Sequence, residues 1–284
     1  MLPTRLPPSV DVCIPVWNRG ELLSPCVTSL RRQLGGVDAT IWLFDNGSDA
    51  ETRAVIRDLA EDDPHTFSVR FPRNMGIPHA VNMFVQSALQ ECDIAGRRRP
   101  DYLLLLDSDA YFRRPIRQLI EILESDYRFG AVSGHRSVEH EPIARRHLVT
   151  PSGVVEIDEK QIERMFCLLL RSEDLAAMVP FPHDTHVDVD WQIAERNPHS
   201  LKTTGRVIAA TDNAVHIGLY DSTWHPVGVP ASAAEAVEID AVLHSLGLMT
   251  SERRARAAAY RAATRLPAAR LDLPGASFRQ ALRP

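Results

Sequence analysis

Short apolar runs alternate with amphipathic stretches along the first 110 residues of the chain. The apolar runs predict four strands, at residues 10–16, 39–44, 67–71 and 102–106. The amphipathic stretches predict three intervening helices, at residues 18–34, 49–60 and 78–90. In the first helix Leu22, Cys26, Leu30 and Leu34 recur every four residues, which is the spacing of a core-facing stripe. Because strands that alternate with helices form parallel sheets covered on both faces, the pattern predicts an α/β fold with a mostly parallel central sheet.

Polar residues follow all four predicted strands. Right-handed crossovers bring the carboxyl ends of parallel strands to one edge of a sheet, and such folds bind their ligands at that edge. We therefore expect Asn18, Asp45, Asn74 and Asp107 to form one polar site. Asn18 also precedes a helix with Glu21 three residues later, which predicts that Asn18 caps this helix.

After residue 110 the pattern is less regular. Further strands are predicted at residues 130–133, 154–157, 165–170 and 206–210, and further helices at 115–124, 172–178 and 190–196. Residues 135–150 are predicted to be a loop, and two alanine-rich helices are predicted after residue 231. We expect a catalytic domain at 1–228, with halves of about 1–112 and 113–228, and a helical extension and tail at 229–284.

The bulk composition is that of a globular protein, with 44% hydrophobic residues among 284. The net charge of −5 argues against nucleic acid as a partner. The four cysteines include no C-x-x-C pair, so buried thiols in a reducing cytoplasm explain them. No signal peptide is visible, and the longest aliphatic run, 103–106, is too short to span a bilayer. We expect a soluble, cytoplasmic protein without a transmembrane segment, and the preference for Arg over Lys favours a bacterial source.

Positive charge is concentrated near the carboxyl terminus, where residues 251–284 hold eight arginines against two acids. We favour the interpretation that this segment is a solvated helix with an arginine face. The alternative is a surface for an anionic partner or for peripheral contact with a membrane.

Two carboxylates, Asp107 and Asp109, end the most apolar predicted strand. Unpaired buried charges are costly, so two acids at this place need a compensating partner. A divalent cation supplies one, because Mg²⁺ and Mn²⁺ prefer oxygen ligands and share them between carboxylates, waters and substrate phosphates. The alternative is that these two acids at the end of the strand cap the next turn.

Seven short motifs occur in an order that resembles the family-2 glycosyltransferases with the GT-A fold. They are VCIPVWNR at 12–19, FDNGS at 44–48, RNMG at 73–76, LLLDSD at 104–109, CLLLRS at 167–172, DVDW at 188–191 and VHIG at 215–218. The resemblance covers about residues 10–220 and implies a GT-A fold. It also implies transfer of a sugar from a nucleoside-diphosphate sugar to a hydroxyl-bearing small molecule or glycan, with inversion and with Mn²⁺ or Mg²⁺ as cofactor.

The resemblance also assigns roles to residues of this chain. It implies a donor site of Pro15, Val16, Asn18, Arg19, Asp45, Asn74, Gly76, Asp107 and Ser108. It implies a metal site of Asp109, Asp107 and His216, with the histidine in its neutral form. The base that takes the acceptor proton is expected at the acidic helix start, with Asp188 as first choice and Asp190 as second. Val187 stands where the family commonly has an acid, which leaves the choice between these two open.

Three other functions use parts of the same pattern. A haloacid-dehalogenase-type phosphatase would use Asp107 as nucleophile, but that motif usually begins the domain and here three strand–helix units precede it. Lys202 also follows the second acidic cluster, whereas such a phosphatase would need its lysine before that cluster. A nucleotidyltransferase would need a Gly-rich basic loop after the first strand, which residues 16–21 lack. A non-catalytic nucleotide-binding protein would have no need for Asp188.

Overall fold

The computed structural model describes residues 6–95, 97–138, 140–182, 189–221 and 232–264, and for 91–95, 263 and 264 it describes the backbone only. Backbone contacts divide the chain into two units, Met1–Gly218 and Leu219–Pro284. The predicted boundary at residue 228 lies outside the described residues, so the division into a catalytic domain and an extension stays a prediction.

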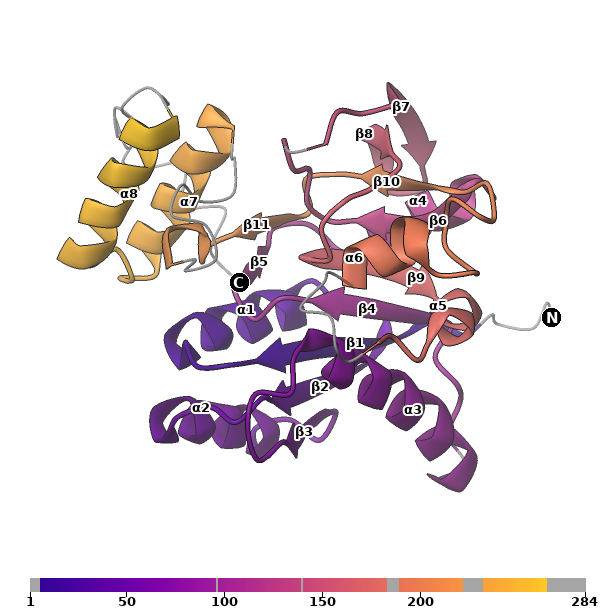
Figure 1. Cartoon of the computed structure of the whole chain (residues 1–284), viewed down its shortest axis with the longest axis horizontal. Helices are drawn as coiled ribbons and strands as arrows, with labels where there is room; N and C mark the ends of the chain where they lie inside the picture. Colours follow the sequence, from indigo (N-terminus) through magenta and orange to yellow (C-terminus); the bar gives the residue numbers. More distant parts are fainter. Residues whose placement is uncertain (1–5, 96, 139, 183–188, 222–231, 265–284) are drawn as a thin grey trace. The chain divides into compact units, whose positions relative to one another are not determined.

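The first unit is built on a nine-stranded sheet whose strand order is β3-β2-β1-β4-β9-β6-β10-β8-β7 (Figure 1). The strands of one half are β1 (Ser9–Val16), β2 (Asp38–Asp45), β3 (Thr66–Arg70) and β4 (Tyr102–Leu106). The strands of the other half are β6 (Phe129–Ser133), β7 (Ala144–Thr150), β8 (Gly153–Lys160), β9 (Cys167–Arg171) and β10 (Val207–Ala210). The first four strands are parallel, so their carboxyl ends meet at one edge, as the alternating pattern predicts.

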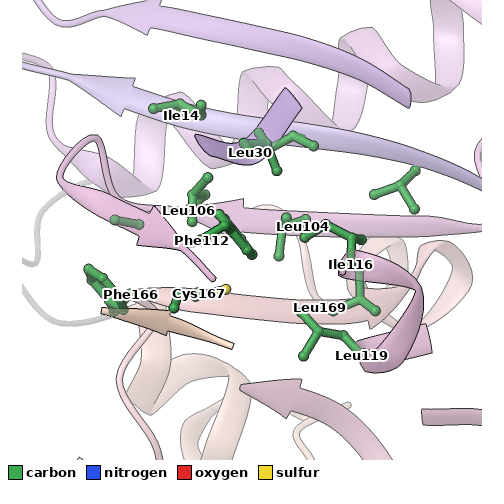
Figure 2. Packing of buried hydrophobic residues seen from close by; sticks show 14 of the residues in the cluster. Ile14, Leu30, Leu104, Leu106, Phe112, Ile116, Leu119, Phe166, Cys167 and Leu169 are labelled. Atoms are coloured by element: carbon green, nitrogen blue, oxygen red, sulfur yellow. The ribbon is translucent and has the colours of Figure 1, made fainter. Parts of the chain in front are cut away.

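Helices cover both faces of this sheet. The helices are α1 (Gly20–Arg32), α2 (Ala50–Glu61), α3 (Ile77–Ala95), α4 (Ile116–Ser125), α5 (Ser172–Met178) and α6 (Val189–Trp191), which continues as a π-helical turn, Gln192–Arg196. Side chains of α1, α2 and α4 pack on one face, in a cluster that includes Ile14, Leu30, Leu104 and Leu169 (Figure 2). Side chains of α3, α5 and α6 pack on the other face, around Leu105. The predicted α/β fold is confirmed.

The sheet is mixed in its second half. Strand β9 runs antiparallel to both β4 and β6, and β8 runs antiparallel to both β10 and β7. Strand β7 corrects the prediction of a loop over 135–150, because its backbone pairs with β8 although its side chains are mostly polar. A two-stranded ladder of β5 (Ala110–Phe112) and β11 (Ala214–His216) was also not predicted, since each strand has three residues.

The second unit contains the two predicted alanine-rich helices, α7 (Ala233–Ser245) and α8 (Ser251–Thr264), after a short 3-10 turn, Leu219–Asp221. Within this unit Arg253 and Arg256 contact Asp221 at 2.8 and 2.9 Å, and Arg261 pairs with Asp240. These arginines therefore stabilise their own unit, while the basic residues after 264 lie outside the described part of the chain. Among the described residues, no helix has the length and apolarity that crossing a bilayer requires.

Candidate functional site

The chain leaves β1 through two left-handed residues, Asn18 (φ 60°) and Arg19 (φ 62°). Residues with a Cβ atom rarely adopt this conformation, which costs about 1–3 kcal/mol each, so the surroundings must hold it. The backbone N–H of Asn18 donates to Ser48 Oγ at 3.0 Å, and Asn18 Oδ1 accepts from the backbone N–H of Asp49 at 2.9 Å. The predicted helix cap is therefore wrong: Asn18 binds the next loop, and Arg19 is the N-cap residue of α1, without a side-chain cap.

Asp45, at the end of β2, is buried and has both carboxylate oxygens engaged. Its Oδ1 accepts from the backbone N–H of Ser48 at 2.7 Å, and its Oδ2 lies 2.6 Å from Nη1 of Arg70. The parallel register of β2 and β3 places Arg70 opposite Asp45. The guanidinium of Arg70 is 45% exposed, so Asp45 holds a cation at the sheet edge.

The segment 73–76 packs against the loop after β2. Asn46 Oδ1 accepts from the backbone N–H of Met75 at 3.1 Å, and Asn74 Oδ1 accepts from that of Gly76 at 2.9 Å. A Cβ atom at Gly47, whose φ is 76°, would lie 2.6 Å from the Cα of Arg73, so only glycine fits there. Pro15 and Val16 stand in register with Phe44 and Asp45, so the predicted donor segments of β1, β2 and 73–76 are brought together.

Asp109 is the buried centre of this edge. Its Oδ2 lies 3.3 Å from Nη1 of Arg19 and 3.3 Å from Nε2 of His216. The backbone N–H of Ile217 donates to the carbonyl of Asp109 at 3.0 Å. Gly218 leaves room for this carboxylate, since a Cβ atom there would lie 1.9 Å from Asp109 Oδ2. Three segments that are distant in sequence therefore meet at one carboxylate.

Asp107 and Ser108 precede this residue and are half-buried. The backbone N–H of Asp107 donates to the carbonyl of Phe166 at 2.9 Å, which ties the end of β4 to the segment before β9. Burial and the charge of Asp109 raise the pKa of Asp107 to about 7. Burial also opposes ionisation of Asp109, but His216 and Arg19 outweigh it and hold the pKa of Asp109 below its usual value. Asp109 is therefore the ionised member of the pair at neutral pH.

Two residues of the other half of the sheet act on Asp107. The charge of Asp190, in α6, raises the pKa of Asp107, and the charge of Arg164 lowers it. Asp190 is half-buried and lies close enough to Asp107 for its charge to act on that carboxyl. Asp188 lies outside the described residues. The π-helical turn that follows α6 is of a kind that is frequent at functional sites.

The donor set around Asp109 matches a hard divalent cation whose coordination a substrate completes. Asp109 Oδ2 and His216 Nε2 lie 3.3 Å apart, and Asp107 lies close enough for the charges of both to act on its pKa, so carboxylate oxygens and an imidazole nitrogen are available there. The described residues contain no group of three or more His, Cys, Asp or Glu side chains that could hold a metal ion by themselves. Because Mg²⁺ and Mn²⁺ usually retain water and bind through one or two carboxylates and substrate phosphates, such a partial set is the expected one.

A sequence model of glycosyl transferase family 2 matches residues 11–199, which is more than half of the chain. The chain belongs to glycosyl transferase family 2. The match spans six of the seven motifs that carry the resemblance and part of the acceptor half. The chain is therefore a glycosyltransferase, and the phosphatase and non-catalytic interpretations are set aside. The comparison with curated proteins gives no match.

Solved glycosyltransferases share the fold of this family-2 glycosyltransferase. The mannosyltransferase PcManGT from Pyrobaculum calidifontis, in complex with GDP-Man and Mn²⁺, has a TM-score of 0.50 and 17% identity over 94% of this chain and 77% of its own. GalNAc-T7, solved with UDP, GalNAc and Mn²⁺, has a TM-score of 0.51 and 13% identity over 74% of this chain. The glycosyltransferase spans 43% of the length of GalNAc-T7. At these identities the likeness shows the GT-A fold alone.

Four residues near the candidate site of the glycosyltransferase were not predicted from its sequence. The sequence gives no indication of Arg70 or Arg164, because the interaction of each is with a residue in another segment. Phe166 resembled an ordinary core residue in an apolar run. Trp17 follows β1 directly and is 53% exposed, and a large exposed aromatic beside Asn18 could have been recognised from its position.

Proposed function

We propose that this glycosyltransferase transfers a sugar from a nucleoside-diphosphate sugar to an acceptor hydroxyl, with inversion and with dependence on Mn²⁺ or Mg²⁺. The observation that carries the proposal is the buried Asp109 carboxylate between Arg19 and His216, beside Asp107. Buried acids at the carboxyl edge of a parallel sheet have the chemistry to hold a cation and a diphosphate.

The donor nucleotide would bind along the ends of β1, β2 and β3. The exposed indole of Trp17 offers a stacking surface for the base, and the guanidinium of Arg70, held by Asp45, offers hydrogen-bond donors. Asn18, Asn74 and Gly76 shape the loops around this surface. Asp45 therefore acts through Arg70 in this proposal, rather than by binding the nucleoside alone.

The diphosphate would lie at Asp107, Ser108 and Asp109. When bound, the metal would neutralise the charge that develops on the diphosphate as the sugar–phosphate bond breaks. Asp109 and Asp107 would hold it through carboxylate oxygens and His216 through its Nε2 atom. Arg19 would stabilise the same negative charge from the other side of Asp109.

The acceptor would bind on the side of α6. Its hydroxyl oxygen attacks the anomeric carbon, its proton passes to an aspartate, and the diphosphate leaves with the electron pair of the broken bond. Asp188 is the first choice for this base and Asp190 the second. The effect of Asp190 on Asp107 supports its place beside the reacting groups. The acceptor is proposed to be a hydroxyl-bearing small molecule or glycan.

Release of free nucleoside diphosphate from a panel of UDP- and GDP-sugars tests the proposal. Both bases belong in the panel, because the similar structures were solved with GDP-Man and with UDP. We expect release with one donor in Mn²⁺ or Mg²⁺ and no release after chelation of the metal. Equal release with and without the chelator would exclude the metal from the reaction.

A further inference from the structure

Two buried rings, those of His135 and Phe166, and the half-buried ring of His216 form a column that ends at Asp109. The ring of His135 lies 5.0 Å from that of Phe166, at 66° between their planes. The ring of Phe166 lies 4.7 Å from that of His216, at 43°. Nε2 of His216 then lies 3.3 Å from Asp109 Oδ2. The column therefore connects the segment after β6, the segment before β9 and strand β11.

Phe166 contacts both parts of the site through different atoms. Its backbone carbonyl accepts the hydrogen bond from Asp107 at 2.9 Å, while its ring lies against His216. Its side chain is 4% exposed and also belongs to the core cluster between the sheet and α1 (Figure 2). A displacement of Phe166 would therefore move the backbone of Asp107 and the imidazole of His216 together.

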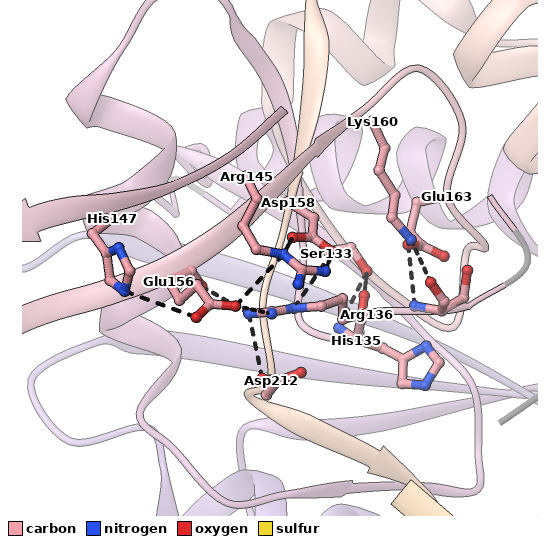
Figure 3. A network of polar contacts seen from close by, with 11 residues as sticks. Ser133, His135, Arg136, Arg145, His147, Glu156, Asp158, Lys160, Glu163 and Asp212 are labelled. Carbon is pink, nitrogen blue, oxygen red and sulfur yellow. Dashed lines mark hydrogen bonds and ion pairs between the residues drawn. The ribbon is translucent and has the colours of Figure 1, made fainter. Parts of the chain in front are cut away.

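The segment before Phe166 is fixed by a buried ion pair. Nζ of Lys160 lies 2.6 Å from Glu163 Oε2, and the two side chains are 1% and 0% exposed. The same carboxylate accepts from the backbone N–H of Ser137 at 3.2 Å and, through Oε1, from that of Arg164 at 3.0 Å. Removal of either partner of such a buried pair would be strongly destabilising, because it would leave an uncompensated buried charge. Lys160 and Glu163 (Figure 3) both bind the backbone of Ser137, so the pair ties the segment before Phe166 to the segment that carries His135.

His135 is fixed from its backbone. Its carbonyl accepts from Ser133 Oγ at 2.7 Å, and its backbone N–H donates to the same hydroxyl at 3.2 Å. The side chain is 6% exposed, and its ring lies against that of Phe166. The ring of Phe166, with the fixed His135 next to it, therefore supports the imidazole of His216. The short strand β11, which carries His216, has only three residues.

We propose that Phe166 is a positioning residue for the metal site, and that its ring, supported by His135, orients the imidazole of His216 toward Asp109. The inference rests on the proposed function, because it gives His216 its role. A hydrogen bond fixes one direction of an imidazole ring, whereas a contact on the ring face fixes its rotation. Outer residues that orient metal-ligating histidines commonly change metal affinity by about tenfold to a hundredfold.

Two variants test the column with moderate changes in side-chain size. Phe166→Leu removes the aromatic face, and His135→Phe keeps a ring in the place of the supporting histidine. Phe129→Leu is the matched control, because Phe129 is fully buried in the same core cluster but belongs to strand β6 rather than to the segment before β9. Thermal unfolding establishes that each variant is folded before binding is compared.

The first readout needs no metal. The ring current of Phe166 should displace the Cε1–H resonance of His216 in the proton NMR spectrum, with assignment by His216→Ala. We expect Phe166→Leu to move this resonance and His135→Phe and Phe129→Leu to leave it nearly unchanged. An unchanged resonance in Phe166→Leu would overturn the contact, whatever the function of the site.

The second readout is the dissociation constant of Mn²⁺, from the electron paramagnetic resonance signal of the free ion. We expect Phe166→Leu to weaken Mn²⁺ binding about tenfold in the wild-type background, by analogy with other residues that orient ligands. In the His216→Ala background Phe166→Leu should have no further effect on Mn²⁺ affinity, because Phe166 acts through the imidazole of His216. An equal loss in both backgrounds, or no loss in the wild type, would overturn the inference.

Asp109→Ala separates this inference from the proposed function. Loss of Mn²⁺ binding in Asp109→Ala with a normal affinity in Phe166→Leu would contradict the positioning role alone. An unchanged affinity in Asp109→Ala would contradict the proposed metal site and, with it, the role of His216.

Discussion

Arg19 and Asp109 connect the two ends of the predicted donor site through one ion pair. Nη1 of Arg19 lies 3.3 Å from Oδ2 of Asp109, although the residues are 90 positions apart in sequence. The left-handed backbone at Asn18 and Arg19 directs the guanidinium to the end of β4. The strained turn after β1 therefore places a positive charge beside Asp109.

The most direct substitution at this pair is Asp109→Asn. It removes the negative charge that Arg19 and His216 stabilise and keeps the shape of the side chain. We expect a loss of donor turnover of at least about a hundredfold, the scale of losing one strong electrostatic contact in an active site. Steady-state rates of nucleoside-diphosphate release measure it. Asp58→Asn is the control, since Asp58 is exposed on α2, and equal rates in the two variants would contradict the role of Asp109.

Gly218→Ala should displace the same carboxylate. The added Cβ atom would lie 1.9 Å from Asp109 Oδ2 and 2.6 Å from its Cγ, so Asp109 must move. We expect a severalfold to hundredfold loss of turnover with a folded protein, because small displacements in active sites have effects of about this size. Gly35→Ala is the matched control, since a Cβ atom there meets nothing within 4 Å. Full activity in Gly218→Ala would show that Asp109 tolerates displacement.

Metal affinity should depend on pH through Asp107. Its folded-state pKa is raised to about 7, so the carboxyl is protonated below this pH and ionised above it. Since the metal binds the ionised form, we expect Mn²⁺ affinity to fall about tenfold for each pH unit below 7 and to level off above it. Calorimetry in two buffers with different ionisation enthalpies also reports the released proton. Asp107→Asn should remove the dependence, and a flat profile between pH 6 and 8 in the wild type would contradict the assignment.

The two candidate bases are distinguished by separating donor binding from transfer. We expect Asp188→Asn to keep the thermal stabilisation by nucleoside diphosphate and Mn²⁺ and to abolish transfer to the acceptor. The carboxamide keeps the size of the side chain but does not accept the hydroxyl proton at neutral pH. If Asp190→Asn abolishes transfer while Asp188→Asn retains it, Asp190 is the base.

The sequence predicted the parallel half of the fold well because local pattern and tertiary structure agree there. Strand β4 occurs at 102–106 as expected, and β1 and β2 differ from their predicted ends by one residue at each affected end. Strand β7 was missed because Arg145, Arg146 and His147 interrupt any apolar run, and cross-strand ion pairs replace apolar packing there. Its pairing to β8 comes from backbone hydrogen bonds that side-chain pattern does not report.

The site was predictable to the extent that its residues follow strands in one half of the sheet. Asp45, Asp107 and Asn18 follow parallel strands, so topology alone indicates that they share an edge. Topology does not predict the direction in which each side chain points at that edge. Asn18 was expected to cap its own helix and instead binds Asp49, and Asp45 binds Arg70, because both contacts depend on loop geometry set by left-handed residues and strand register.

The central claim is that Asp109 makes nucleoside-diphosphate binding depend on a divalent metal. The measurement that tests it most directly is the thermal unfolding of the wild type and of Asp109→Asn with UDP or GDP, in the presence and absence of Mn²⁺. A ligand at about a hundred times its dissociation constant adds about 2.7 kcal/mol to the free energy of unfolding. We predict such a stabilisation for one nucleotide in the wild type, only with Mn²⁺, and none in Asp109→Asn. An equal stabilisation without Mn²⁺, or in Asp109→Asn, would contradict the claim.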